Sequence, residues 1–290
     1  MFWKEYLDHI RILDKRRLES PTGSSATHAT SLEEINEFLS THFRLHPDVH
    51  YDIPIDSLRG NVILTVRDTN KTAPLAGCIR YKSLGICDQK QIHLVDCFCV
   101  HTDWRGKGVA DYLLHELHTI MKDRPYAIFI KEGKPLPIIP FYQGQYVYRV
   151  IKKEPIHSVQ SISIDTAYRI MAHHQVFHPF FQLAQPSSNQ EWKLWKQGVH
   201  HVLACVQDTY QRLHGKRMGW ITAWIESPAI TDTMRNDASY QLSGSVAYDM
   251  IWMNRIHVTD SRWTMDGPFY WYTYQWEPSI TIGTSYCLIT

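Results

Sequence analysis

The hydrophobic pattern of the first half alternates between strand-like runs and one helical stripe. Residues 62–66 and 75–82 are rich in apolar and β-branched side chains, and the turn-forming run 68–71 lies between them, which predicts a β-hairpin. Residues 92–100 predict a third strand. Five apolar residues then share one helical face: Val109, Leu113, Leu117, Ile120 and Met121. The pattern therefore predicts strand, loop and helix in direct succession over residues 92–121.

The segments around this unit predict shorter elements. Ser31 precedes an apolar stripe with acidic first-turn residues, which predicts a helix beginning at Leu32. Residues 44–60 contain two prolines and a glycine, so we expect a loop with at most a short helix. Residues 127–131 and 146–150 read as strands.

The second half repeats this order in weaker form. Residues 191–196 predict the start of a helix, and residues 201–206 and 218–225 predict a second hairpin. Two aromatic runs, 245–253 and 269–276, predict further strands with no helix between them.

This repetition predicts three parts along the chain. Residues 1–30 are interpreted as an N-terminal arm, residues 31–150 as a first half and residues 151–290 as a second half. The mixture of strands and helices places the chain in the α+β class.

Composition excludes several function classes. The net charge is +1, with 30 basic and 29 acidic residues among 290, so no basic excess indicates nucleic-acid binding. No apolar run approaches the roughly 20 residues that span a bilayer, and the N-terminus carries no secretory pattern. The six cysteines lack the spacing of a disulfide framework. We therefore expect reduced thiols, a cytoplasmic location and a monomer.

The loop Arg105-Gly106-Lys107-Gly108 lies between the third predicted strand and the helix that follows it. Its two glycines allow backbone N–H groups to approach a pyrophosphate closely, and the helix directs its positive dipole end at the anion. Arg105 and Lys107 add positive charge. This order resembles the acyl-CoA pyrophosphate loop of the GNAT superfamily. The alternative is an ordinary glycine-rich turn that binds no ligand.

The strand before the loop offers further chemistry. The backbone amides of Cys97 and Phe98 are the candidates for holding the oxyanion of a thioester carbonyl. Strand alternation places Asp96 on the face opposite Cys97, where it is either a general base or a polar partner of the loop. Cys97, Cys99 and His101 share one face but lack a fourth ligand, so we expect no metal site. No Cys-His-Asn pattern supports Cys97 as a nucleophile.

A more specific resemblance follows from these residues. Residues 95–101, Val-Asp-Cys-Phe-Cys-Val-His, and residues 105–110, Arg-Gly-Lys-Gly-Val-Ala, resemble the N-myristoyltransferase family, in which Phe-Leu-Cys-Val-His leads to Arg-Ser-Lys-Arg-Val-Ala. Four other runs resemble family segments in the same order: 75–79, 133–137, 146–149 and 272–279. The resemblance covers about residues 32–150 well and 187–290 in patches. Gly108 stands where the family has a cation.

The resemblance implies a fold, a reaction and a proton acceptor. The fold is two GNAT-like halves that form one continuous mixed sheet flanked by helices. The reaction transfers a fatty acyl group, myristoyl above all, from acyl-CoA to the N-terminal glycine of a protein or peptide. The α-carboxylate of Thr290 is the general base, and Cys97 and Phe98 hold the oxyanion. One alternative is an acetyl-CoA-dependent GNAT N-acetyltransferase in which Asp96 or Tyr148 handles protons, and another is a non-catalytic acyl-CoA- or peptide-binding module.

The resemblance also implies two sets of binding residues. The acyl-CoA set is Phe2, Trp3, Val100, Arg105, Gly106, Lys107, Gly108, Val109 and Ala110. The peptide set is Asp48, Tyr51, Asp96, Tyr146, Tyr148 and Thr222.

Overall fold

The computed structural model describes residues 30–43, 48–59, 62–67, 74–87, 89–152, 158–173, 182–183, 189–255, 260–276 and 285–287. The helices are α2 (Leu32–His42), α3 (Ile55–Leu58), α4 (Val109–Ile120), α5 (Ile164–His173) and α6 (Asp232–Gly244), with a 3₁₀ turn, η1, at Thr102–Trp104. The strands are β1 (Val49–Tyr51), β2 (Val62–Arg67), β3 (Leu75–Cys87), β4 (Lys90–Val100), β5 (Ala127–Glu132), β6 (Tyr142–Val150), β7 (Val159–Ser161), β8 (Gln182–Leu183), β9 (Gln190–Gln197), β10 (His200–Leu213), β11 (Lys216–Glu226), β12 (Met250–Asn254), β13 (Thr264–Tyr274) and β14 (Tyr286–Cys287).

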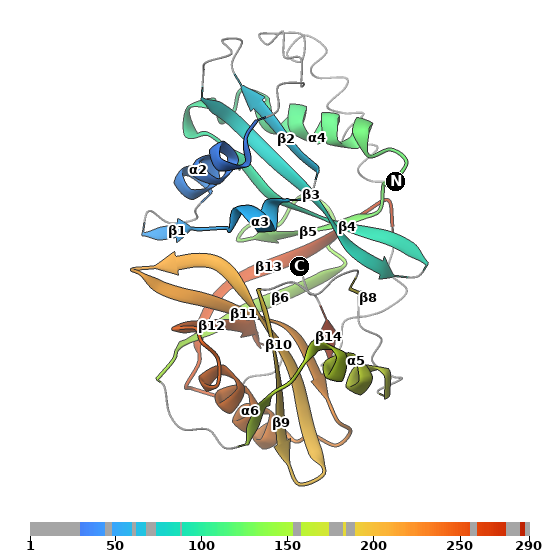
Figure 1. Ribbon diagram of the computed structural model, residues 1–290, viewed down its shortest axis with the longest axis vertical. Coiled ribbons are helices and arrows are strands. Elements are labelled where there is room, and N and C mark those ends of the chain that lie inside the picture. The colour runs from blue at the N-terminus through green and yellow to red at the C-terminus, as the bar shows by residue number, and fades with distance from the viewer. Residues whose placement is uncertain are drawn as a thin grey trace. The chain divides into compact units, whose positions relative to one another are not determined.

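Hydrogen bonds join the described strands into one mixed sheet of 14 strands (Figure 1). Its main path runs β2-β3-β4-β5-β13-β6-β12-β11-β10-β9-β7. The pairs β4–β5 and β11–β12 are parallel, whereas β2–β3 and β9–β10 are antiparallel. The predicted α+β class, with a continuous mixed sheet and flanking helices, is confirmed.

The chain divides into two compact units. Unit 1 takes its residues from 1–83, 93–129 and 273–277, and unit 2 takes the others.

The core of unit 1 lies between α4 and the strands β2, β3 and β4. Leu113 and Leu117 of α4 pack against Ile79 of β3 and Val66 of β2 in one buried cluster. Gly77 of β3 allows the close approach of α4. A Cβ at Gly77 would lie only 2.9 Å from the Val109 Cγ1 atom and 3.0 Å from the Cys99 carbonyl oxygen. The predicted hairpin, third strand and helix are all present.

The opposite face of β3 carries α3. Arg80 Nη1 donates to the carbonyl oxygen of Ser57 in α3 at 3.0 Å. Because successive strand residues face opposite sides, Arg80 points to α3 and Gly77 points to α4. The neighbouring helix α2 begins at the predicted position, since the Ser31 hydroxyl accepts a hydrogen bond from the Glu34 amide at 3.1 Å.

Unit 2 contains the second predicted hairpin, formed by β10 and β11. The helix predicted at 191–196 is wrong, because these residues form β9, which pairs antiparallel with β10. Trp192 and Trp195 are separated by three positions, which imitates a helical stripe. Both are buried, together with the two residues between them, so β9 is covered on both faces and lacks strand alternation.

Two helices of unit 2 have no counterpart in the sequence-based prediction. α5 and α6 precede β9 and β12, and the strand predicted to begin at residue 245 begins at Met250 because α6 extends to Gly244. The Thr231 hydroxyl caps α6 by accepting from the Met234 amide at 3.3 Å. The buried face of α6 includes Ser239 and Ser243, so it presents no apolar stripe in the sequence.

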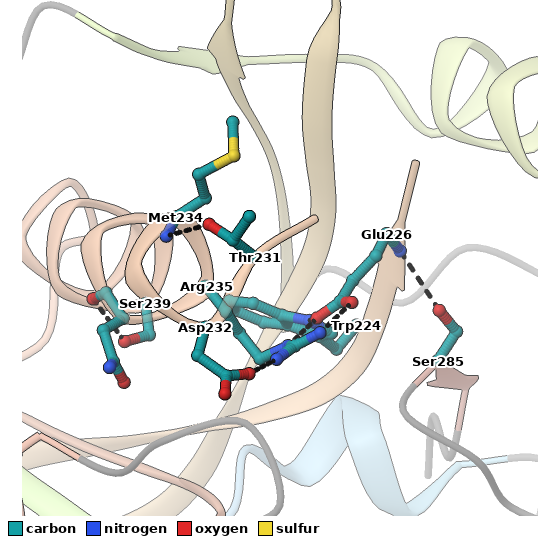
Figure 2. A network of polar contacts seen from close by, with 9 residues as sticks. Trp224, Glu226, Thr231, Asp232, Met234, Arg235, Ser239 and Ser285 are labelled. Atoms are coloured by element: carbon teal, nitrogen blue, oxygen red, sulfur yellow. Dashed lines mark hydrogen bonds and ion pairs between the residues drawn. The ribbon is translucent and has the colours of Figure 1, made fainter. Parts of the chain in front are cut away.

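A buried carboxylate joins α6 to the end of β11 (Figure 2). Glu226 accepts hydrogen bonds from Trp224 Nε1 at 2.7 Å and from Arg235 Nε and Nη2 at 2.6 and 2.9 Å. The Glu226 amide donates to the Ser285 hydroxyl at 3.1 Å, and β14 then pairs antiparallel with β11. These contacts tie residues 285–287 to β11.

No helix in the described ranges combines the length and apolarity required to cross a lipid bilayer.

Candidate functional site

The site in unit 1 is built around the loop between β4 and α4. His101 begins the loop, and its Nδ1 atom accepts from the Asp103 amide at 3.1 Å. Gly106 and Gly108 have φ angles of +73° and +82°, which favour glycine. A Cβ at either glycine would meet no atom within 4 Å, so backbone conformation rather than crowding requires glycine at both positions.

The start of α4 has the features of an anion site. Gly108 is the N-cap, and as a glycine it supplies no side-chain hydrogen bond to the first turn of α4. The N-terminal amides of α4 therefore receive no side-chain cap from this residue, and they lie at the positive end of the helix dipole. Arg105 and Lys107 are exposed on the loop, with the Lys107 ammonium 5.0 Å from the centre of the Trp104 ring. A diphosphate placed here would meet backbone donors and two cations.

The strand before the loop is interrupted at Cys97, whose φ angle is +48°. Such a value is uncommon for a residue with a Cβ, and within a strand it marks a bulge. Val95 and Val100 both pack against the cluster beneath α4, although an uninterrupted strand would place residues of opposite parity on opposite faces. The side-chain phase of β4 therefore shifts at Cys97.

This shift corrects the predicted orientation of Asp96. The sequence placed Asp96 and Cys97 on opposite faces, but both point to the face of Tyr51 and Arg80. The Tyr51 hydroxyl lies 3.8 Å from Cys97 Sγ, and Arg80 Nε donates to Asp96 Oδ1 at 2.6 Å. The prediction was wrong because strand alternation assumes a negative φ at every residue.

Burial and charge act together on this face. Burial alone lowers the pKa of Arg80, but the adjacent Asp96 carboxylate outweighs it and raises that pKa above its usual value. Burial raises the pKa of Tyr51, and the neighbouring Cys97 and Asp96 add to the effect. Burial lowers the pKa of Lys82, which lies next along the same face of β3.

The thiols of β4 are not activated. Burial raises the pKa of Cys97 and of Cys99 to about 12, so neither carries an appreciable thiolate fraction near neutral pH. Neither has the low pKa expected of a cysteine nucleophile. Among the described residues, no group of three His, Cys, Asp or Glu side chains could hold a metal ion.

The other predicted site residues are distributed over both units. Asp48 is exposed beside β1, whereas Tyr51 is buried on β1. Tyr146 and Tyr148 of β6 stack on Phe269 and Trp252, with ring centroids 4.1 and 5.1 Å apart, and both tyrosines lie in unit 2. Thr222 is fully buried on β11. Val100, Val109 and Ala110 flank the loop. Phe2, Trp3 and Thr290 lie outside the described residues.

Sequence reasoning missed Arg80 and Cys78. Both lie on β3 with their side chains directed at Asp96 and Cys97. A signal existed for Arg80, because a charged residue within a run of buried apolar positions requires a charged partner. The acid in the next strand, Asp96, is that partner.

Comparisons with known proteins support the fold. No family model matches the chain, and no curated protein matches it by sequence. Two structures of Saccharomyces cerevisiae N-myristoyltransferase, one with bound myristoyl-CoA and inhibitors and one with bound myristoyl-CoA, match with TM-scores of 0.61 and 0.62. Their sequence identities to this chain are 11% and 12%. Each alignment covers 88% of this chain, and the two alignments cover 79% and 78% of the yeast chains.

A third structure of the same yeast enzyme with bound myristoyl-CoA matches with a TM-score of 0.59 and 12% identity over 91% of this chain and 88% of that chain. At such low identity the likeness concerns the fold. The chain thus has the double GNAT-like fold of N-myristoyltransferase, as the sequence predicted.

Proposed function

We propose that this protein is an acyl-CoA-dependent acyltransferase that transfers a fatty acyl group, myristoyl above all, to the N-terminal glycine of a protein or peptide. The observation that carries the proposal is the direct succession of a bulged strand, a loop with two left-handed glycines and a helix start without a side-chain cap. The bulge at Cys97 and the two left-handed glycines, Gly106 and Gly108, lie in one continuous segment of unit 1. The fold in which they occur is that of an enzyme crystallised with myristoyl-CoA.

Each part of the segment has a chemical role in this proposal. The amides at the start of α4, with Arg105 and Lys107, bind the phosphates of the acyl-CoA. Val100, Gly106, Gly108, Val109 and Ala110 complete that part of the site, and Phe2 and Trp3 cover the acyl-CoA. The backbone N–H groups of Cys97 and Phe98 donate to the thioester oxygen as negative charge develops on it.

The reaction is direct attack by an amine. The glycine nitrogen forms a bond to the acyl carbon, the carbon–sulfur bond breaks, and coenzyme A leaves as its thiolate. The thiolate takes the second proton, which the nitrogen loses as it becomes an amide. The Thr290 α-carboxylate takes the proton that the ammonium group must lose before attack. Residues 31–150 bind the acyl-CoA in this scheme and residues 151–290 complete the peptide site, in a cytoplasmic monomer. The peptide contacts are assigned to Asp48, Tyr51, Tyr146, Tyr148 and Thr222. Asp96, the sixth residue of the predicted peptide set, is bound by Arg80 instead.

The environment of Asp96 argues against the acetyltransferase alternative in which this residue is the base. Both of its carboxylate oxygens accept hydrogen bonds from Arg80. A proton taken from a substrate amine would weaken both contacts, so Asp96 serves better as a partner of Arg80 than as a proton acceptor.

A competition experiment tests the proposal. A peptide that begins with glycine is incubated with equal concentrations of myristoyl-CoA and acetyl-CoA, and mass spectrometry identifies the product. A peptide with a blocked N-terminus is the matched control. We expect myristoylation of the free glycine alone. Acetylation as the main reaction would support the acetyltransferase instead, and failure to bind either acyl-CoA by calorimetry would refute both enzymes.

The role of the Thr290 carboxylate has its own test. A variant extended by a few residues beyond Thr290 should bind myristoyl-CoA normally but lose acyl transfer, because its carboxylate is displaced from the amine. Undiminished turnover in the extended variant would refute this role.

A further inference from the structure

Contacts from β1 and from β3, the neighbour of β4 in the sheet, converge on Asp96 and Cys97. Arg80 Nε and Nη2 donate to the two oxygens of Asp96, the first at 2.6 Å. The Cys78 thiol donates to the Cys97 carbonyl oxygen at 3.3 Å, and the Tyr51 hydroxyl lies 3.8 Å from Cys97 Sγ. We refer to Tyr51, Cys78 and Arg80 as the clamp. All of these residues belong to unit 1.

The clamp is buried and held from behind. The exposed fractions of Tyr51, Cys78 and Arg80 are 7%, 0% and 5%. Arg80 also donates from Nη1 to the carbonyl oxygen of Ser57 in α3, so its guanidinium is fixed on the side away from Asp96 as well. In the ion pair, the Arg80 side chain is buried and the Asp96 side chain is 25% exposed. An ion pair taken even partly out of water adds little net stability, so we consider its effect on the local backbone geometry.

The position that the clamp contacts is the strained one. Cys97 has a φ angle of +48°, and a residue with a Cβ keeps such a conformation only where the surrounding structure imposes it. The ion pair with Arg80 fixes the residue immediately before the bulge. The Cys78 thiol fixes the carbonyl group of the bulged residue itself. The contacts thus bracket the peptide units whose N–H groups are assigned to the oxyanion.

We propose that Arg80, through its ion pair with Asp96, is a positioning residue that holds the backbone of Cys97 and Phe98 in the conformation required to bind the thioester oxygen. The inference rests on the proposed acyltransferase function and deepens it. Arg80 touches no substrate in this scheme and acts only through the strand that it holds. Asp96 is then an anchor for Arg80.

The test compares two neutralised ion pairs. Arg80→Gln combined with Asp96→Asn removes both charges and leaves no lone buried charge. Arg67→Gln combined with Glu34→Gln does the same to an ion pair of β2 and α2, in the same unit, and is the matched control. Arg80→Lys alone keeps a cation and is the conservative variant.

We expect kcat for acyl transfer to fall about tenfold to a hundredfold in the Arg80/Asp96 variant, since the loss of one oxyanion donor has an effect of about 10²–10³. The Kd for acyl-CoA should stay within about twofold of the wild type, because the loop at α4 is intact. Arg80→Lys should recover part of kcat, and the Arg67/Glu34 control should match the wild type. An unchanged kcat, or a parallel loss of acyl-CoA binding, overturns the inference.

A second-site change separates positioning from general destabilisation. Glycine adopts a positive φ without strain, so Cys97→Gly should reduce the need for the clamp. In that background the Arg80/Asp96 changes should lower kcat only about threefold or less, a loss that is smaller because the strain is gone. A loss of kcat that is equally large with and without the Cys97→Gly substitution contradicts positioning.

Hydrogen exchange distinguishes failure of the inference from failure of the proposed function. If the wild type neither binds nor uses acyl-CoA, the proposed function falls. The exchange of the amides at residues 96–99, measured by mass spectrometry, then decides the inference by itself. Faster exchange in the Arg80/Asp96 variant than in the Arg67/Glu34 control supports the clamp, and equal exchange overturns it.

Discussion

Gly77→Ala is the substitution that most directly tests the packing of α4 on the sheet. The added methyl group would lie 2.9 Å from Val109 Cγ1, 3.0 Å from the Cys99 carbonyl oxygen and 3.1 Å from Leu113 Cδ1. The first neighbour is a stiff β-branched side chain and the second is backbone, so neither yields easily. Relief requires α4 to move away from β3 and the backbone of β4 to shift at Cys99.

Two opposing effects determine how much Gly77→Ala changes the free energy of unfolding. Replacing glycine by alanine where alanine fits adds about 0.4–1 kcal/mol of stability, because it reduces the conformational entropy of the unfolded chain. Overpacking a filled core lowers stability by about 1–3 kcal/mol. Because all three contacts are at 3.1 Å or less, we expect the second effect to win, with a net loss of about 0.5–2 kcal/mol.

The assay is urea unfolding of Gly77→Ala and of a control, Gly267→Ala. A Cβ at Gly267 meets no atom within 4 Å, so the control should stay within about 0.5 kcal/mol of the wild type. Val109→Ala removes the nearest contact, and Gly77→Ala should be less destabilising in that background. Stabilisation by Gly77→Ala, or the same loss with and without Val109, would refute the packing argument.

Three other predictions follow from the described contacts. Burial raises the pKa of Cys97 in the folded state to about 12 from an ordinary 9.0, so above pH 9 the folded state retains a proton that the unfolded state releases. The free energy of unfolding, measured in urea, should therefore fall as pH rises above about 9. It should fall less steeply after Cys97→Ser. Arg235→Met leaves the buried Glu226 carboxylate without its cation and should lower the free energy of unfolding by about 3–5 kcal/mol. The control Arg59→Met, at the exposed ion pair with Asp56, should change the free energy of unfolding by less than about 1 kcal/mol. In calorimetric titrations, Arg105→Gln should weaken acyl-CoA binding and flatten its salt dependence, and Lys196→Gln, an exposed control in unit 2, should do neither.

The elements that the sequence predicted correctly are those with strong local signals. The hairpin of β2 and β3 combines two β-rich runs with turn residues between them, and α4 combines an apolar stripe with a glycine at its start. Ser31 marks the start of α2 through a hydrogen bond three residues ahead. Each of these signals lies within a few residues of the structure that it specifies, which is why propensity and periodicity were sufficient.

The misread elements of unit 2 have tertiary causes. β9 is buried on both faces, so its side chains do not alternate, and the spacing of Trp192 and Trp195 favoured a helix. α6 packs with small polar residues such as Ser239 and Ser243, whose burial depends on their neighbours. A hydrophobic pattern cannot indicate a face that is not hydrophobic. In both elements the partner, rather than the local run, decides the structure.

The orientation of Asp96 depends on residues that lie far from it in the sequence. Alternation along a strand is reliable until one residue adopts a positive φ, and here Cys97 does so without being a glycine. The contacts that accompany this conformation come from residues 16, 19 and 46 positions away, Arg80, Cys78 and Tyr51. A pattern of neighbouring residues in the sequence gives no information on contacts across such separations. The same bulge that defeats the alternation rule also turns the peptide units assigned to the oxyanion, so the part of the strand least predictable from sequence is the part on which the proposed chemistry depends.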